Sequence, residues 1–144
     1  MSEKIASFAA GCFWGVEARF REARGVLDAV SGYMGGHTEQ PTYKQVCAGD
    51  SGHAEAVQVT FDDEQISFRE LLNLFFDMHN PTTLNRQGPD FGSQYRSAVF
   101  WHDEEQREAT EQKISEVNAS GKWPDPVVTQ LAKAATFWPA EEYH

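Results

Sequence analysis

The order of apolar and polar residues in the first part of the chain predicts two strands separated by a helix. Residues 5–9 are mostly apolar and lead into Gly11, which indicates a short strand that ends in a turn. Gly25 marks the end of the helix that follows, and residues 26–30 alternate as a second strand. The glycine-rich residues 32–36 predict a loop. The apolar residues of the helix recur at helical spacing: Phe13, Val16 and Phe20.

The middle of the chain predicts a strand, a helix and a long loop. Residues 54–61 alternate with the period of a strand. Ser67 and Glu70 form the capping-box pattern that opens a helix, and Pro81 stops that helix. Residues 82–94 show no regular pattern, and a loop of this length in a compact domain is a candidate functional loop. The helix places four apolar residues on one face: Leu71, Leu74, Phe75 and Met78.

The last part of the chain predicts two strands on either side of a helix. Residues 95–101 form the first of these strands. Asp103 and Gln106 open the helix, which ends at Gly121, and residues 127–131 form the last strand. Strands and helices mix without a strict strand–helix–strand repeat. The pattern therefore predicts an α+β fold, in which helices pack against a sheet.

Composition narrows the class of protein. The 144 residues suffice for one domain, spanning 1–144, with a core of its own. The chain carries 12 Lys and Arg against 22 Asp and Glu, for a net charge of −10. This balance argues against binding to nucleic acid or to an anionic membrane surface, because both need a basic face. The longest apolar-leaning stretch, residues 5–14, is about half of what a membrane-spanning helix requires.

The chain has two cysteines, Cys12 and Cys47, too few for a disulfide scaffold, which favours a reducing compartment. The segment Ala10-Gly11-Cys12 is similar to the end of a bacterial lipoprotein signal, but the residues before it lack a charged region and a full apolar region. We therefore expect a cytoplasmic protein. Cys47 follows Tyr43 by four residues in an expected helical turn; we expect it in the core, and its involvement in redox chemistry stays open.

Cys12 is the first candidate for chemistry, because it lies just after a strand and a glycine, at the start of a predicted helix. The N–H groups of a first helical turn have no partner within the helix and carry partial positive charge, so they favour a thiolate. Phe13 and Trp14 follow directly and can form the wall of an apolar pocket. A lone cysteine is more often a small buried hydrophobic residue, and that alternative stays open at this point.

Glu55 is the second candidate. The alternation of its strand places it on the same face as Val57, Val59 and Phe61, so its carboxyl is expected to point inward. Burial raises the pKa of a carboxyl, and a carboxyl that keeps its proton near neutrality can act as a general acid. The alternative is a solvated carboxylate at the mouth of the strand with no role in chemistry.

Three further residues carry weaker signals. Tyr43 and Tyr95 are phenols in or beside loops, able to donate a hydrogen bond to a developing oxyanion, and Asp90 in the long loop can orient a tyrosine. Each has a common structural alternative, a packed tyrosine or an exposed aspartate. The five histidines never occur at ligand spacing and no Cys-x-x-Cys is present, so we expect no metal site.

Taken together, these features resemble the A type of peptide methionine sulfoxide reductase. The resemblance extends in order over nearly the whole chain, and the Gly-Cys-Phe-Trp-Gly element with the Gln-Tyr-Arg-Ser element is its most specific part. It implies a ferredoxin-like α/β sandwich, with a mixed or antiparallel sheet and packed helices. The matching segments are 11–15 with Glu17, 32–36, 43–46, 52–55, 85–97 and 140–144.

The resemblance implies a role for each candidate. Cys12 is the nucleophile that attacks the sulfoxide sulfur, and Glu55 protonates the sulfoxide oxygen. Tyr43 and Tyr95 hydrogen-bond to that oxygen, while Asp90 supports Tyr95. The apolar pocket for the substrate's methyl group is formed by two aromatic residues: Phe13 and Trp14.

The resemblance also implies the substrate, the S epimer of methionine sulfoxide, free or in proteins, and hence a role in repair under oxidative stress. An ionised Glu55 would repel a nearby thiolate, so we expect a working state with Cys12 ionised and Glu55 neutral, titrating as a coupled pair. No bound cofactor is implied; the reductant is an external thiol, from thioredoxin, glutaredoxin or glutathione. We expect a monomer that binds neither nucleic acid nor a membrane.

The sequence departs from the family pattern near its C-terminus. Many members carry one or two recycling cysteines in a tail, and this sequence has none beyond Cys47. Unless the sequence is shortened, we expect a Cys12 sulfenic acid that an external thiol reduces. Two other classes stay open: a one-cysteine peroxidase, and a non-catalytic protein that binds oxidised peptides. Both leave the matching segments unexplained.

Overall fold

The computed structural model describes residues 3–37, 39–48 and 51–140, apart from the side chain of Cys47, and within them helices pack against one large sheet. The helices are α1 (Phe13–Arg21), α2 (Tyr43–Cys47), α3 (Phe68–Asp77), the 3-10 helix η1 (Ser93–Tyr95) and α4 (Glu104–Ser120). The strands are β1 (Glu3–Ala10), β2 (Val26–Met34), β3 (Ala54–Asp62), β4 (Arg86–Gln87), β5 (Asp90–Phe91), β6 (Ser97–Trp101), β7 (Gln130–Lys133) and β8 (Trp138–Pro139).

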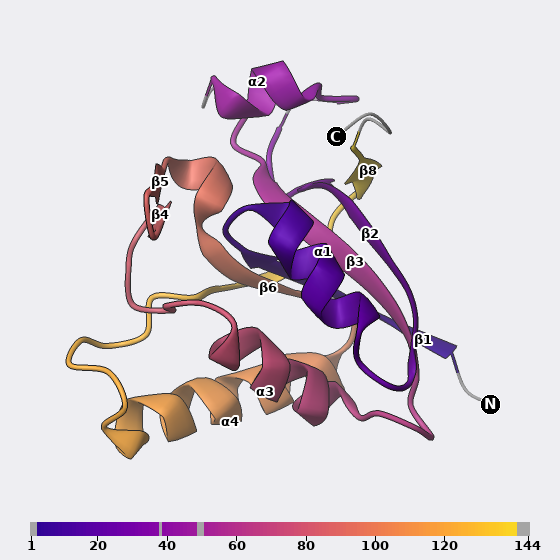
Figure 1. Ribbon diagram of the computed structural model, residues 1–144, viewed down its shortest axis with the longest axis vertical. Coiled ribbons are helices and arrows are strands. Elements are labelled where there is room, and N and C mark those ends of the chain that lie inside the picture. Colours follow the sequence, from indigo (N-terminus) through magenta and orange to yellow (C-terminus); the bar gives the residue numbers. More distant parts are fainter. Residues whose placement is uncertain (1–2, 38, 49–50, 141–144) are drawn as a thin grey trace.

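The main sheet has six strands in the order β7-β6-β1-β3-β2-β8 (Figure 1). All neighbours are antiparallel except β6 and β7, which run parallel. The central four strands come from two strand–helix–strand units, β1-α1-β2 and β3-α3-β6, whose strands interleave. This interleaved arrangement is the split βαβ pattern of ferredoxin-like folds. The predicted α+β fold with a mixed sheet is therefore confirmed.

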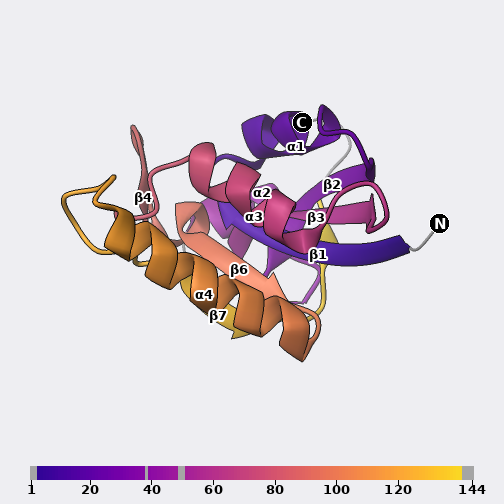
Figure 2. The ribbon, with the colours of Figure 1, turned by 90° about the horizontal axis from the view of Figure 1, so that it is seen from below.

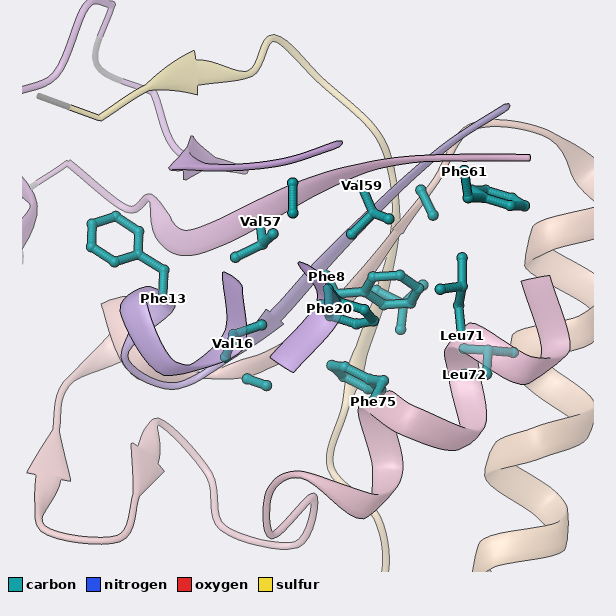
Figure 3. Close-up of a cluster of buried hydrophobic side chains, with 14 of the residues drawn as sticks. Phe8, Phe13, Val16, Phe20, Val57, Val59, Phe61, Leu71, Leu72 and Phe75 are labelled. Carbon is teal, nitrogen blue, oxygen red and sulfur yellow. The ribbon is translucent and has the colours of Figure 1, made fainter. Parts of the chain in front are cut away.

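Helices α1 and α3 lie on one face of the sheet, and α4 packs beside α3 (Figure 2). Large apolar side chains from the two helices meet side chains of β1 and β3 between the layers (Figure 3). Phe8 of β1 stacks on Phe20 of α1 and contacts Phe75 of α3, with ring centroids 5.0 and 5.3 Å apart. The predicted helical face of α3 is confirmed, because Leu71 and Phe75 are fully buried there.

The opposite face of the sheet has a smaller core, closed by the C-terminal part of the chain. Met34 and Phe100 are buried on this face, and Phe137 packs against them. Gly32 is required there, because a Cβ at this position would lie 2.4 Å from the Phe137 ring. Since both faces are covered, β3 is buried on both sides along most of its length. No helix in the described ranges combines the length and apolar character needed to cross a membrane.

Two predicted boundaries were wrong at strand ends. Residues 32–34 were expected to form a loop, but they continue β2, where Tyr33 pairs with Glu55 of β3. The glycines suggested a turn, and pairing with a distant strand overrides that local preference. Tyr95 was expected in a strand, whereas it ends η1 and the strand begins at Ser97.

The last predicted strand begins three residues too early and ends two residues too early. Residues 127–131 were expected, and the structure forms β7 at Gln130–Lys133. The backbone N–H of Val127 donates to Asn118 Oδ1 (2.8 Å), and that of Val128 donates to the carbonyl of Pro81 (2.8 Å). These donors serve contacts with other segments, so pairing with β6 starts only beyond them.

Candidate active site

Cys12 lies where β1 turns into α1, and the residue is exposed. Strand β1 runs antiparallel to β3 with Phe8 opposite Val57, so the end of β1 comes close to the start of β3, where Glu55 lies. Cys12 occupies the N-cap position of α1 without a side-chain capping bond. The predicted position at a helix start is confirmed, and the buried alternative is excluded for this cysteine.

Gly11 allows another segment to approach the backbone beside Cys12. Its φ of +96° favours glycine, and a Cβ here would lie 2.8 Å from Cγ of Gln87. The Gln87 amide holds its own loop in place, accepting from the N–H of Asn80 (2.9 Å) and donating to the Asn80 carbonyl (2.8 Å). Gln87 thus positions the loop that carries Asp90 against the cysteine, a role that the sequence alone did not reveal.

Glu55 is 1% exposed, which confirms that its side chain points inward. Its Oε1 accepts a hydrogen bond from the backbone N–H of Phe13 (3.2 Å). That N–H belongs to the first turn of α1 and has no partner within the helix, so the carboxyl completes the helix start in place of a capping side chain. Oε2 is buried and has no hydrogen-bond partner among the described residues. A proton on Glu55 therefore belongs on Oε2.

The surroundings of Glu55 favour its neutral form. Burial raises the pKa of the carboxyl to about 7, although the hydrogen bond from Phe13 N–H opposes the shift. The negative charge of Asp90 contributes to the same increase. A pKa of about 7 allows Glu55 to hold a proton near neutral pH, as a general acid must.

The thiol of Cys12 behaves differently from the sequence-based expectation. Although the residue is exposed, burial around the thiol raises its pKa above the ordinary value, and the charges of Glu55 and Asp90 raise it further. The backbone N–H groups of Trp14 and Gly15 lower the pKa, as expected for a helix start, but they do not outweigh burial. The expectation of a lowered thiol pKa was therefore wrong, because partial burial of the thiol and the charges of Glu55 and Asp90 outweigh the helix start.

Aromatic rings lie beside the cysteine. Phe13 is fully buried, whereas Trp14 is 48% exposed. Tyr43, the first residue of α2, stacks on Trp14 with ring centroids 6.4 Å apart and an interplanar angle of 14°. Tyr33 of β2 packs against Phe13 from the other side, with centroids 5.7 Å apart. The structure thus brings Tyr43 to Phe13 and Trp14, and Tyr33 is an aromatic neighbour to which the sequence analysis gave no role.

The other two candidates come from the long loop. Tyr95 is half-buried at the end of η1, which packs against β3. Asp90 is half-buried in β5 and pairs with Gln87 across the small β4–β5 hairpin. Its charge acts on the pKa of both Cys12 and Glu55, which places it beside the two reactive groups. The expected support of Tyr95 by Asp90 stays a prediction.

Helix α1 is fixed to the sheet close to the cysteine. Oε1 of Glu17 accepts from the backbone N–H of Ser31 (3.0 Å) and from its hydroxyl (2.7 Å), and Arg21 pairs with the same carboxylate. These bonds lower the pKa of Glu17 despite its partial burial. Glu17, named in the sequence only as part of a matching segment, therefore holds the helix that carries Cys12.

Two predictions involve groups outside the described residues: the burial of the Cys47 side chain, and the matching segment beyond Ala140. Among the residues that are described, no group of three or more His, Cys, Asp or Glu side chains is arranged to hold a metal ion. The arrangement that remains is a thiol, a carboxyl with a pKa near neutrality, and aromatic rings. It suits a neutral substrate that needs a nucleophile and a proton.

The sequence is similar to proteins whose reaction is known. The family model for peptide methionine sulfoxide reductase matches residues 4–144, nearly the whole chain. The chain belongs to the peptide methionine sulfoxide reductase family. Two similar relatives are named peptide methionine sulfoxide reductase MsrA. The reductase is 52% identical to that of Acidobacterium capsulatum over 96% of its own length and 89% of the relative's. It is 54% identical to the relative from Methanoculleus marisnigri, over 96% of its own length and 85% of the relative's.

Solved structures agree with the family. The reduced form of Mxr1 from Saccharomyces cerevisiae matches with a TM-score of 0.92 and 37% identity, covering 99% of the reductase and 82% of Mxr1. Methionine sulfoxide reductase A of Corynebacterium diphtheriae matches with a TM-score of 0.86 and 33% identity. The match covers 99% of the reductase and 72% of the Corynebacterium protein. Mxr1 in complex with Trx2 also matches, with a TM-score of 0.72 and 27% identity over 97% and 82%. Reduction of methionine sulfoxide is the family's activity, so the reductase is an enzyme of this class.

Proposed function

We propose that the reductase converts the S epimer of methionine sulfoxide, free or in proteins, to methionine through a sulfenic acid on Cys12. Glu55 is the general acid, Tyr43 and Tyr95 hydrogen-bond the sulfoxide oxygen, and Asp90 supports Tyr95. The observation that carries the proposal is the buried Oε2 of Glu55. It has no partner among the described residues and belongs to a carboxyl with a pKa of about 7, beside the exposed Cys12.

The step balances without a further reactant. The Cys12 thiolate attacks the sulfoxide sulfur while Glu55 delivers a proton to the sulfoxide oxygen. The attack forms an S–S bond, and the S–O bond breaks as the protonated oxygen leaves as hydroxide. Hydroxide then adds to the cysteine sulfur and the S–S bond breaks, so that Cys12 ends as a sulfenic acid and methionine leaves as the thioether. Two electrons have passed from the cysteine sulfur to the methionine sulfur. Protonation is needed because an unprotonated sulfoxide oxygen is a poor leaving group.

The two groups must share one proton in the working state. In the free enzyme the thiol holds that proton more strongly than the carboxyl does, because the pKa of Cys12 is raised above its ordinary value and that of Glu55 is about 7. Moving the proton from an ordinary thiol near pKa 8.5 to such a carboxyl already costs roughly 2 kcal/mol. We expect substrate binding to supply this energy, since the sulfoxide oxygen is the acceptor that Oε2 lacks.

The aromatic rings beside Cys12 suit the substrate's methyl group. Phe13 is buried, and Trp14 and Tyr43 stack on each other, so these rings offer apolar contact beside Cys12. A neutral sulfoxide has no charge for a protein to bind. Affinity therefore comes from burying the methyl group and from the hydrogen bonds to the oxygen.

Recycling of Cys12 completes the proposed cycle. In the 144-residue sequence Cys47 is the other cysteine. We propose that two external thiols, supplied by glutathione, glutaredoxin or thioredoxin, reduce the sulfenic acid to the thiol with release of water and a disulfide. The structure of Mxr1 in complex with Trx2 supports a thioredoxin as one such donor.

The test uses resolved R and S methionine sulfoxide peptides with a thiol donor. We expect the wild type to reduce the S epimer and Cys12→Ser to lose all activity. A preference for the R epimer, or turnover by Cys12→Ser, would contradict the proposal, and faster consumption of peroxide would favour a peroxidase. Intact mass after one equivalent of sulfoxide should show one added oxygen. A Cys12–Cys47 disulfide would exclude recycling by an external thiol alone.

A further inference from the structure

A cavity of about 370 Å³ lies beside the long loop, lined by polar and apolar residues from four separate segments. Its walls carry hydroxyl and amide groups from Thr83, Asn85, Ser93 and Gln130. Arg96 is the one charged residue among the lining residues. A cavity of this composition offers hydrogen-bond donors and a positive charge but no negative charge.

The guanidinium of Arg96 is held by neutral acceptors. Its Nη1 donates to the carbonyl of Ser93 (2.9 Å), Nη2 to the carbonyl of Gly52 (3.1 Å), and Nε to Oε1 of Gln130 (2.9 Å). A guanidinium has five N–H donors, so two are left over. Among the described residues no carboxylate forms an ion pair with it.

An arginine that is partly withdrawn from water without a counter-charge is unusual, because taking a cation out of water costs energy that a paired anion normally offsets. Burial lowers the pKa of Arg96, and no acid acts in the opposite direction. The chain has 22 Asp and Glu, so acids are plentiful elsewhere. Among the described residues, the charge of Arg96 therefore has no anionic partner.

The cavity adjoins the elements that carry the proposed site. Gly52 precedes Glu55 by three residues, so the two lie at most about 10 Å apart. Ser93 begins the 3-10 helix that ends at Tyr95. The carbonyl of Asn85 accepts from the N–H of Gly92 (2.8 Å), which closes the loop around the β4–β5 hairpin. In Figure 1 this hairpin lies at the same end of the sheet as the start of β3.

We propose that this cavity binds a carboxylate side chain of the substrate, an Asp or Glu that lies two to four residues from the oxidised methionine. The spacing follows from the span of about 10 Å, because an extended peptide advances about 3.3 Å per residue. Leu84, 72% exposed at the rim, can cover the methylene groups of that side chain. The inference rests on the proposed reduction of methionine sulfoxide in peptides and adds a sequence preference to it.

The preference is tested with capped peptides that contain one S sulfoxide. An aspartate is placed in turn at each position from four residues before the sulfoxide to four after it, and each peptide is compared with its asparagine counterpart. We expect kcat/KM to rise about three- to tenfold for aspartate two to four residues away on one side. The ratio should shrink at high ionic strength, because salt screens the attraction.

A variant that places a negative charge inside the cavity tests the same site from the side of the protein. Asn85 has φ +50°, a conformation that aspartate tolerates well, so Asn85→Asp brings a carboxylate to the cavity with little strain. We expect this variant to have the same kcat/KM for aspartate peptides as for their asparagine counterparts. The control is Asn118→Asp on α4, whose Oδ1 accepts from Val127 N–H (2.8 Å), as an aspartate oxygen also would. Because Val127 neighbours the lining residue Val128, a second control, Asn73→Asp at an exposed position of α3, adds the same charge to an element that contributes no lining residue. It should leave the ratio unchanged.

The outcomes separate the two claims. Equal kcat/KM for all aspartate and asparagine peptides, with normal turnover, would overturn the carboxylate site and leave the reductase activity intact. If Asn85→Asp and Asn73→Asp both had equal kcat/KM for aspartate and asparagine peptides, the carboxylate site would also be overturned. Net charge alone would then explain the preference. Failure of the wild type to reduce any sulfoxide peptide would instead contradict the proposed function.

Discussion

At the scale of single residues, the side chain of Glu55 is shielded from water by the same packing that builds the sheet. Its neighbours along β3, Val57 and Val59, are fully buried apolar residues on the same face. Burial keeps a proton on the carboxyl near neutrality, and it also makes the ionised form costly. The feature proposed to serve catalysis therefore lowers the stability of the fold at high pH.

This cost predicts a stability gain for Glu55→Gln. The folded pKa is about 7 against an ordinary value of 4.5, so the folded state holds an extra proton between these values, and stability falls as pH rises through that window. The shift corresponds to at most about 3 kcal/mol. We expect urea unfolding to show Glu55→Gln more stable than the wild type at pH 8, with a much smaller difference at pH 4.5. An equal effect at both pH values would contradict a raised pKa.

The positions of the reactive residues could be predicted from local sequence, but the pKa of Cys12 could not. The glycine before Cys12 and the alternation around Glu55 are short-range signals, and both led to correct placements. The thiol pKa depends on burial and on the charge of Asp90, which a hairpin almost 80 residues further along the chain brings close. A helix start alone gave the wrong direction because it includes none of these distant contributions.

At the scale of elements, a buried hydrogen-bond chain joins the end of α3 to the start of β6 and the segment before β7. Nδ1 of His79 lies 2.7 Å from the carbonyl of Phe75, which can only accept, so Nδ1 carries the proton. Nε2 must then accept from the hydroxyl of Ser97 (2.7 Å), which in turn accepts from Thr129 (2.8 Å). Burial lowers the pKa of His79 to about 4, so the ring is neutral near pH 7.

The chain predicts a graded loss of stability. Ser97→Ala leaves the buried Nε2 of His79 without a donor and should cost about 1–3 kcal/mol in unfolding free energy. Thr129→Val keeps the shape of the side chain and leaves the Ser97–His79 bond in place, so it should cost less. Urea unfolding at pH 7 checks both. A larger loss for Thr129→Val than for Ser97→Ala would show that the order of donors is different.

Elements with local start signals were predicted well. Ser67 accepts from the N–H of Glu70 and Asp103 accepts from that of Gln106, as the capping patterns indicated. Elements whose ends are set by pairing with distant strands were not predicted correctly. The extension of β2 to Met34 depends on pairing with β3, and the register of β7 depends on β6. Capping is a property of four neighbouring residues, whereas strand ends depend on chain segments far away in the sequence.

At the scale of the whole molecule, the interleaved order of the strands brings the site together. Strands β1 and β3 are adjacent and antiparallel, so the residue after β1 meets the beginning of β3. The β4–β5 hairpin then closes over this junction through the contact of Gln87 with Gly11. The fold class was predictable from the alternation of elements, but the closure by the hairpin was not, because residues 82–94 show no regular pattern.

The proposed reaction depends on a proton that Glu55 delivers while Cys12 attacks, and one kinetic measurement can detect this proton transfer. It is the single-turnover rate of Cys12 oxidation by an S sulfoxide, followed across pH in the wild type and in Glu55→Gln. We expect the wild-type rate to rise with an apparent pKa near 7 and to fall at higher pH, when the shared proton is lost. Glu55→Gln should react about 10²–10⁴ times more slowly, with a residual rate that rises with pH as thiolate forms. Equal rates with the same pH profile in both proteins would show that Glu55 does not deliver the proton.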